Sequence, residues 1–228
     1  TVVPEYKFEF TNTSSSKDEY INGYVKVNAN SYTEEKGYGL GNGDYHINEN
    51  GCLPTGDNTI KIDVPDGFYD ITVYRKGGAR ADVYNNGVQI INNTTSSGSQ
   101  NRPSGYGVMY APRMEVTGGQ INLTIGNTSG GNERVASVEV VRVPQKYKKQ
   151  VIWIAGDSES ANYYPQNADG DDLDNNKVMM TGFGMQLEKF LSPTKYAVAN
   201  FGQPSATVKT WYNECFESVK KLIQKDDV

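Results

Sequence analysis

The sequence contains few of the residues on which metal, redox or disulfide chemistry depends. Its 228 residues include two cysteines, Cys52 and Cys215, and a single histidine, His46. Two cysteines this far apart cannot form a disulfide framework, and their spacing matches no zinc-binding pattern. We therefore expect two unpaired thiols, no metal and no other cofactor.

The chain also lacks a basic excess and a long apolar run. Its formal net charge is -5, whereas a nucleic-acid-binding surface needs a basic stripe to contact phosphates. Its longest basic cluster, Lys146, Lys148 and Lys149, is short and typical of a solvated linker. No apolar run approaches the roughly 20 residues that span a bilayer. These absences exclude nucleic acid and membrane lipid as expected partners.

Aromatic and small polar residues are abundant. Tyrosine occurs 16 times and phenylalanine 7 times, which is enough for a folded core in one large or two small domains. The chain begins at Thr1 with no apolar signal region, so we interpret its start as processed or trimmed. Its abundant Asn, Ser, Thr, Gly and Tyr are typical of secreted, polysaccharide-directed proteins, so we expect a secreted or extracellular location.

The first 143 residues are typical of β-structure. Turn residues such as Pro65-Asp66-Gly67 and Asn86-Gly87 separate short apolar segments, and alternation with period two buries one face of a strand. The expected strands lie at 6–10, 60–64, 68–74, 81–84, 88–91, 121–125 and 135–143. This pattern predicts an antiparallel, jelly-roll-like β-sandwich at 1–143.

A different pattern begins after a polar linker at 144–150. The order is a continuous apolar strand at 151–155, a helix at 184–191, a strand at 196–200 and a helix at 211–225. Strand, helix, strand and helix are the beginning of an α/β sheet. A third strand should begin where the sequence reaches 226–228. We therefore interpret 151–228 as an incomplete α/β domain.

The turn Gly156-Asp157-Ser158 follows the first of these strands. A serine there has its hydroxyl at the carboxyl edge of the sheet, near helix N-terminal N–H groups that can hold an oxyanion. Glycine allows the sharp turn. An ordinary strand–turn–helix connection capped by Asp157 or Ser158 remains the alternative.

The order of several motifs resembles the SGNH (GDSL-type) hydrolases, and most closely their rhamnogalacturonan acetylesterase branch. These motifs lie at 156–158 (GDS), 163–165 (YYP), 181–187 (TGFGMQL), 200–203 (NFGQ) and 209–211 (KTW). Residues 6–10 and 36–40 are similar to the galactose-binding or carbohydrate-binding modules that precede such domains. The resemblance implies a flavodoxin-like catalytic domain that removes acetyl esters from pectic or related plant polysaccharide.

Carried over by position, the resemblance makes Ser158 the nucleophile and its backbone N–H one oxyanion donor. Ser205 stands where the family has a glycine whose N–H is another donor, although serine tolerates fewer backbone conformations. Glu159 stands where a small polar residue is more usual, and its carboxylate would resist a nearby oxyanion.

The family's oxyanion asparagine and its catalytic Asp and His have no counterpart at the expected positions. The single histidine, His46, lies in the β-rich part. A serine without a base is a poor nucleophile, so the chain alone is not expected to complete the reaction. Three interpretations stay open: the N-terminal piece of a longer esterase that needs its C-terminal part as a partner, a chain trimmed for its β-sandwich, or a non-catalytic pseudo-esterase that binds glycan.

Glycan binding by the β-sandwich is the hypothesis for its tyrosines and arginines, which are expected in loops. The selected candidates are Tyr38, Tyr45, Tyr106, Arg80 and Arg102, with Tyr32, Tyr110, Arg113 as further ones. Some of these tyrosines can instead belong to the core, and the module can simply pack on the catalytic domain. The acidic run at 169–174 does not fit the EF-hand template, so we expect a solvated loop rather than a metal site.

Overall fold

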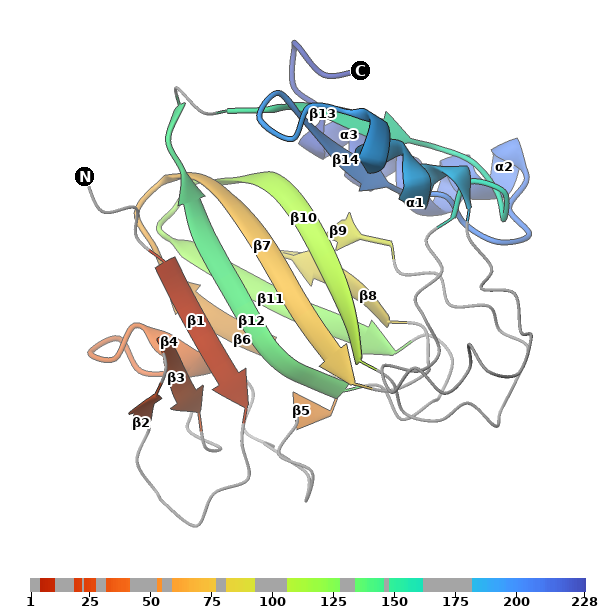
Figure 1. Cartoon of the computed structure of the whole chain (residues 1–228). Helices are drawn as coiled ribbons and strands as arrows, with labels where there is room; N and C mark the ends of the chain where they lie inside the picture. Colours follow the sequence, from red (N-terminus) through yellow and green to blue (C-terminus); the bar gives the residue numbers. More distant parts are fainter. Residues whose placement is uncertain are drawn as a thin grey trace, which may run out of the picture.

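Three β-sheets make up most of the regular structure (Figure 1). The computed structural model describes residues 5–10, 19–21, 23–27, 32–41, 53–54, 59–76, 81–92, 106–127, 134–145, 148–161 and 182–228. The α-helices in these ranges lie at 183–222, and no helix there is long and apolar enough to cross a membrane.

The first sheet has seven strands in the order β10-β7-β12-β1-β3-β2, with β5 paired to β12. Its strands are β1 (Glu5–Phe10), β2 (Glu19–Ile21), β3 (Tyr24–Val27), β5 (Leu53–Pro54), β7 (Gly67–Lys76), β10 (Tyr106–Val116) and β12 (Arg134–Val143). The prediction of a wholly antiparallel arrangement is wrong for one pair, because β1 and β3 run parallel. Period-two alternation could not reveal this, since it is the same for both strand directions.

The second sheet has five antiparallel strands in the order β4-β6-β11-β8-β9. They are β4 (Tyr38–Leu40), β6 (Thr59–Asp63), β8 (Ala81–Asn85), β9 (Val88–Ile91) and β11 (Gln120–Asn127). Asn86 and Gly87 connect β8 to β9 with φ angles of 49° and 78°. Two positive φ angles in a two-residue hairpin are what Asn-Gly favours, so the turn predicted there is confirmed.

One apolar core contains side chains from both of these sheets. Ile71 of β7 and Val140 of β12 are fully buried with Ile62 of β6 and Leu123 of β11. In β6, buried and half-buried residues alternate along the strand, as the period-two pattern predicts. Burial of each such aliphatic side chain contributes about 1.5 to 3 kcal/mol to folding.

Strand β10 is absent from the sequence-based expectations, as are the short strands β2, β3, β4 and β5. Its register against β7 shifts between Ala111 and Met114, and Arg113 has a φ of 53°. A bulge of this kind interrupts the alternation by which a strand is recognised. Tyr106, Tyr110 and Arg113 were expected in loops, and this placement is wrong because all three lie on β10.

The third sheet consists of two parallel strands, β13 (Gln150–Ile154) and β14 (Tyr196–Asn200). Between them lie α1 (Phe183–Leu187) and the 3₁₀ helix η3 (Glu188–Phe190). After β14 come α2 (Val208–Trp211), the π-helical turn η4 (Tyr212–Phe216) and α3 (Glu217–Leu222), which follow one another without a break. The strands and helices predicted within 151–228 therefore lie close to their expected positions.

The end of the described chain pairs with the free edge of β13. The N–H of Val228 donates to the Val151 carbonyl at 3.1 Å, and the Val228 carbonyl accepts from the Trp153 N–H at 2.8 Å. This is the hydrogen-bond pattern of a parallel bridge, on the edge opposite β14. Residues 226–228 are not part of a strand in the structure, so the third strand expected near them stays a prediction.

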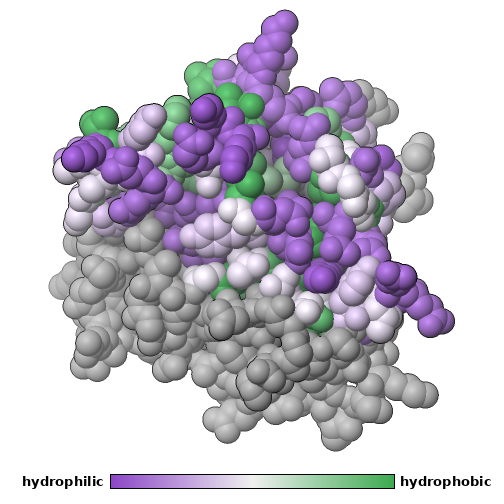
Figure 2. Space-filling view, turned by 180° about the vertical axis from the view of Figure 1, so that it is seen from behind, coloured by the Kyte–Doolittle hydropathy of each residue, from purple (hydrophilic) through white to green (hydrophobic). Residues whose placement is uncertain are grey.

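Hydrophilic side chains cover most of the described surface seen from behind. Figure 2 shows them in purple, with hydrophobic residues scattered among them. The most exposed large apolar side chains are Phe190 at 82% and Val208 at 89%. Single exposed apolar residues are normal on protein surfaces and need no partner to explain them.

Candidate functional site

Ser158 lies in the exposed turn that follows β13. The side chain of Asp157 accepts a hydrogen bond from the Glu159 N–H at 3.0 Å. The Asp157 carbonyl accepts from the Ser160 hydroxyl at 2.9 Å and from the Ala161 N–H at 3.1 Å. These contacts fix the turn and leave Ser158 on the surface. Ser158 is not in a helix, and 159–161 form a turn and a bend where the helix was expected to begin.

The loop after β14 lies directly against this turn. The Phe201 N–H donates to the Ile154 carbonyl at 2.9 Å, and the Gln203 N–H donates to the Gly156 carbonyl at 2.9 Å. Because β13 and β14 are parallel, both loops leave the same edge of the sheet. Ligands of open α/β sheets bind at this carboxyl edge. The structure therefore brings the neighbourhood of Ser158 and the segment with Ser205 together.

Asn200 joins the two loops through its buried amide. Its Nδ2 donates to the Ser160 carbonyl at 2.6 Å, and its Oδ1 accepts from the Gly202 N–H at 2.9 Å. Asn200 is 8% exposed, and a buried amide bonded on both sides holds its neighbours rigidly. Sequence reasoning did not assign it this role. The available signal was a polar residue at the carboxyl end of a buried strand.

Close approach of backbone segments explains the glycine at 202. A Cβ there would lie 2.4 Å from the Ser160 hydroxyl oxygen and 2.8 Å from the Ala161 nitrogen. Gly184 in α1 is equally confined, since its Cβ would lie 2.3 Å from Nδ2 of Asn200. Glycine at both positions lets α1 and the two loops pack together.

Ser205 is exposed and has a φ of 65°. This is the left-handed region, which costs a residue with a side chain roughly 1 to 2 kcal/mol and costs glycine little. The backbone at 205 therefore has the conformation of a glycine position, as the resemblance to the esterases implies. Its role as an oxyanion donor stays a prediction.

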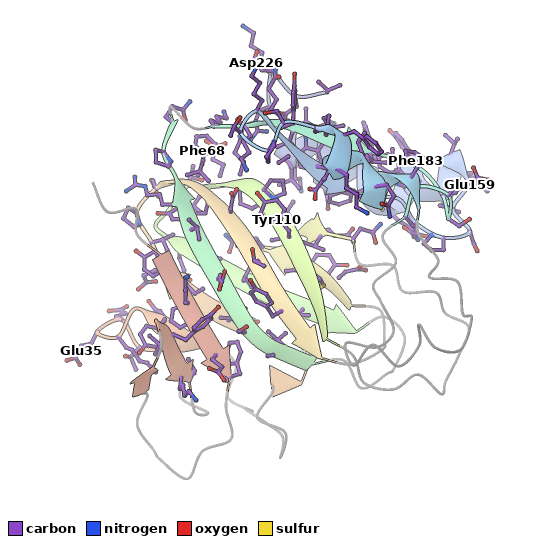
Figure 3. All side chains as sticks on the ribbon, in the orientation of Figure 1. Glu35, Phe68, Tyr110, Glu159, Phe183 and Asp226 are labelled. Carbon is purple, nitrogen blue, oxygen red and sulfur yellow. The ribbon has the colours of Figure 1, made fainter. Side chains whose placement is uncertain are left out.

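Glu159 is exposed beside Ser158, and its carbonyl accepts from the Phe183 N–H at 2.7 Å. Figure 3 shows Glu159 and Phe183 at the same end of the C-terminal part. The carboxylate therefore belongs to the surface around Ser158. In water-exposed surroundings its repulsion of a developing oxyanion is weakened.

The helices after β14 hold the Ser205 loop from its other side. Trp211 Nε1 donates to the Phe201 carbonyl at 2.8 Å. The buried thiol of Cys215 donates to Oε1 of Gln203 at 3.4 Å, and Nε2 of Gln203 donates to Glu214. Sequence reasoning assigned no role to Gln203, which is 9% exposed. The loop is therefore ordered by polar contacts with α2 and η4.

The candidates for sugar binding are not gathered at one place in the described part of the chain. Tyr38 lies on β4 and Tyr106 on β10, which belong to different sheets. Phe8 contacts the Tyr38 ring at a centroid distance of 4.9 Å, and Lys36 Nζ lies 4.5 Å from its centroid. Their predicted position in loops is wrong for both tyrosines. Their role in binding stays a prediction.

Several other predicted residues lie outside the described residues. They are Tyr45, Arg80, Arg102, His46, Cys52, the segment 163–165 and the acidic run at 169–174. Arg113 is described and is buried at 6% exposure, which removes it from the set of surface candidates. Within the described ranges, no group of three or more His, Cys, Asp or Glu side chains is placed to hold a metal ion.

No protein-family model matches the chain. The chain is 25% identical over 240 residues to YxiM of Bacillus subtilis (strain 168), which is described as an uncharacterized esterase. The match covers 97% of this chain and 57% of that protein, so the chain spans little more than half the length of this relative.

Among solved structures, the crystal structure of the YxiM protein from Bacillus subtilis matches with a TM-score of 0.71 at 23% identity. That match covers 98% of this chain and 62% of the YxiM chain, and it shows that the fold is shared. A family two carbohydrate esterase from Cellvibrio japonicus matches over 94% of this chain and 57% of its own, at 12% identity. Its TM-score of 0.28 is too low to carry an argument.

Proposed function

We propose that this chain is part of a serine carbohydrate esterase of the SGNH (GDSL) type. The observation that carries the proposal is the exposed Ser158 at the carboxyl edge of β13, with the loop of Ser205 hydrogen-bonded against its turn. The similarity to YxiM supports the same reaction class, because that relative is described as an esterase.

In the proposed reaction the Ser158 hydroxyl attacks the carbonyl carbon of an acetyl ester. The hydroxyl proton passes to a general base, the sugar hydroxyl leaves, and water then hydrolyses the acetyl-serine to acetate. The backbone N–H groups of Ser158 and Ser205 are the proposed donors to the oxyanion.

We further propose an acetylated pectic polysaccharide, such as rhamnogalacturonan, as the substrate and a secreted or extracellular location. In this proposal the two larger sheets at 1–143 form a carbohydrate-binding-like β-sandwich, 144–150 is a linker and 151–228 belongs to the flavodoxin-like catalytic domain. Two separate apolar cores support this division. The two larger sheets share one core, and the residues at 151–228 have another, which includes Val151 and Phe201.

A non-catalytic, glycan-binding pseudo-esterase is the second candidate. The carboxylate of Glu159 beside Ser158 favours it, because an anion there opposes the charge that develops in the transition state, even though exposure to water weakens the effect. The strained φ of Ser205 points the same way, since a catalytic loop would gain from glycine at that position.

Acetate release from acetylated pectin, measured with the whole protein of which this chain is proposed to be a part, distinguishes the two candidates. We expect Ser158→Ala to lower the rate by roughly 10³-fold or more, because no other group replaces the nucleophile. Ser192→Ala is the matched control, since Ser192 is exposed between η3 and β14 and away from the turn. Equal rates for wild type and Ser158→Ala would contradict the esterase proposal and favour the pseudo-esterase.

A further inference from the structure

We propose that Asn92, which directly follows β9 of the five-stranded sheet, is a positioning residue for the loop that carries Ser205. Its side chain is 0% exposed, although asparagine is usually a surface residue. Nδ2 of Asn92 donates to the Phe201 carbonyl at 3.2 Å and lies 3.6 Å from Sγ of Cys215. As a statement about catalysis, this inference rests on the proposed esterase function.

The hydrogen bond from Asn92 helps to fix the peptide group between Phe201 and Gly202. The Phe201 carbonyl accepts from both Asn92 and Trp211 Nε1. The next N–H, that of Gly202, donates to Oδ1 of Asn200. The plane of the Phe201–Gly202 peptide is therefore held from three directions, and Asn92 supplies the only one of these three contacts that comes from the β-rich part.

The orientation of the Phe201–Gly202 peptide determines the positions of Gln203 and Ser205, which follow it in the loop. The Gln203 N–H donates to the Gly156 carbonyl in the turn of Ser158, and Ser205 follows two residues later. Catalysis by an oxyanion donor requires the N–H within a few tenths of an ångström of its place. Rotation of the Phe201–Gly202 peptide would therefore move the proposed donor relative to the nucleophile.

Asn92 is itself placed by a rigid support. Strand β9 packs against α3, and the Gln89 N–H donates to the Ser218 hydroxyl at 3.1 Å. Figure 1 shows β9 on the side of the two larger sheets that faces the C-terminal helices. Sites built on strands and helices are more precise than sites on loops, and Asn92 is attached directly to the end of β9. The five-stranded sheet is thereby part of the architecture that shapes the candidate site.

The test compares Asn92→Ala and Asn92→Asp with Ser218→Ala in the whole protein of which this chain is proposed to be a part. Asn92→Asp keeps the size of the side chain but replaces the donor NH₂ by an oxygen that repels the Phe201 carbonyl. Ser218→Ala removes a hydrogen bond of the same interface without touching the loop. Amide hydrogen exchange of 201–206 and kcat and KM for acetate release are measured for each variant, with the melting temperature as a check on folding.

We expect the amides of 201–206 to exchange at least 10-fold faster in both Asn92 variants and at the wild-type rate in Ser218→Ala. The kcat should fall about 10-fold to 100-fold with KM within 2-fold of wild type. Unchanged exchange in Asn92→Ala overturns the inference, and so does an equal loss of kcat in Ser218→Ala. If Ser158→Ala retains full activity, the esterase function is wrong, and the exchange rates alone still decide whether Asn92 positions the loop.

Discussion

Replacement of Asp227 by asparagine is expected to destabilise the protein more than any surface change. The side chain of Asp227 is 1% exposed and pairs with the guanidinium of Arg113, whose side chain alone is 4% exposed. It also accepts from Trp153 Nε1 at 3.0 Å, from the Val151 N–H at 3.0 Å and from the Gln224 N–H at 2.9 Å. A single buried group thus joins the seven-stranded sheet, β13 and the last residues of the chain.

The size of the expected loss of stability follows from the contacts that Arg113 keeps after Asp227 is replaced. Arg113 keeps its charge in a buried place, where its other described partner is the Lys149 carbonyl at 3.1 Å. Removing one partner of a buried ion pair typically costs 3 to 5 kcal/mol. We expect Asp227→Asn to lower the free energy of unfolding by about that amount. Because the loss comes mainly from the buried charge left on Arg113, Arg113→Met combined with Asp227→Asn should recover part of the loss.

Urea unfolding followed by tryptophan fluorescence measures this effect, because Trp153 contacts Asp227 directly. A loss of 3 to 5 kcal/mol lowers the midpoint by about 1 to 2 M urea. Glu217→Gln is the control: its partner Lys220 is 4.0 Å away and both side chains are more than 60% exposed, so the expected cost is about 0 to 1 kcal/mol. A cost below 1 kcal/mol for Asp227→Asn would refute the reasoning.

The same carboxylate predicts a pH dependence. Burial acts to raise the pKa of Asp227, but hydrogen bonds from Arg113 and Trp153 and from two backbone N–H groups outweigh it, so its pKa lies below the ordinary value of 3.8. A lowered pKa means that the stabilisation is present above the pKa of the unfolded chain and is lost as pH falls through that of the folded protein. Stability should therefore decline below about pH 4, and this decline should be smaller in Asp227→Asn.

Two further substitutions test the loops of the candidate site. Ser205→Gly should raise the free energy of unfolding by about 1 kcal/mol, because glycine adopts a φ of 65° without strain. Urea unfolding measures this change, and a variant less stable than wild type would contradict the account. Gly202→Ala should cost about 1 to 3 kcal/mol, because its Cβ would meet Ser160 and Ala161 at less than 3.0 Å. Gly126→Ala in β11 is its control, since that Cβ has no neighbour nearer than 3.6 Å, and equal losses in the two variants would argue against the clash.

Sequence patterns were informative where neighbours along the chain decide the structure. Alternation located strands such as β6 and β9 to within about a residue, and the Asn86-Gly87 dipeptide located the hairpin between β8 and β9. The buried strand at 151–155 followed by Gly156-Asp157-Ser158 placed Ser158 in the turn where the structure has it.

Patterns failed where an irregular backbone or strand direction was involved. Strand β10 was missed because the bulge at Pro112 and Arg113 interrupts its alternation. The parallel pairing of β1 and β3 carries no signature in either strand. Arg113 was grouped with exposed sugar-binding candidates, since nothing local to residue 113 reveals that its charge is buried against Asp227.

The sequence by itself determined most of the longer strands, the hairpin turn at Asn86-Gly87 and the exposed serine after a buried strand, because side-chain period and turn chemistry act over a few residues. Only the tertiary structure decided the polar contacts that shape the surroundings of Ser158. Asn92 reaches the Phe201 carbonyl across 109 residues, and Arg113 reaches Asp227 across 114. Such pairs form because packing of apolar faces buries these polar groups away from water, so that they need partners within the protein. That packing depends on residues throughout the chain.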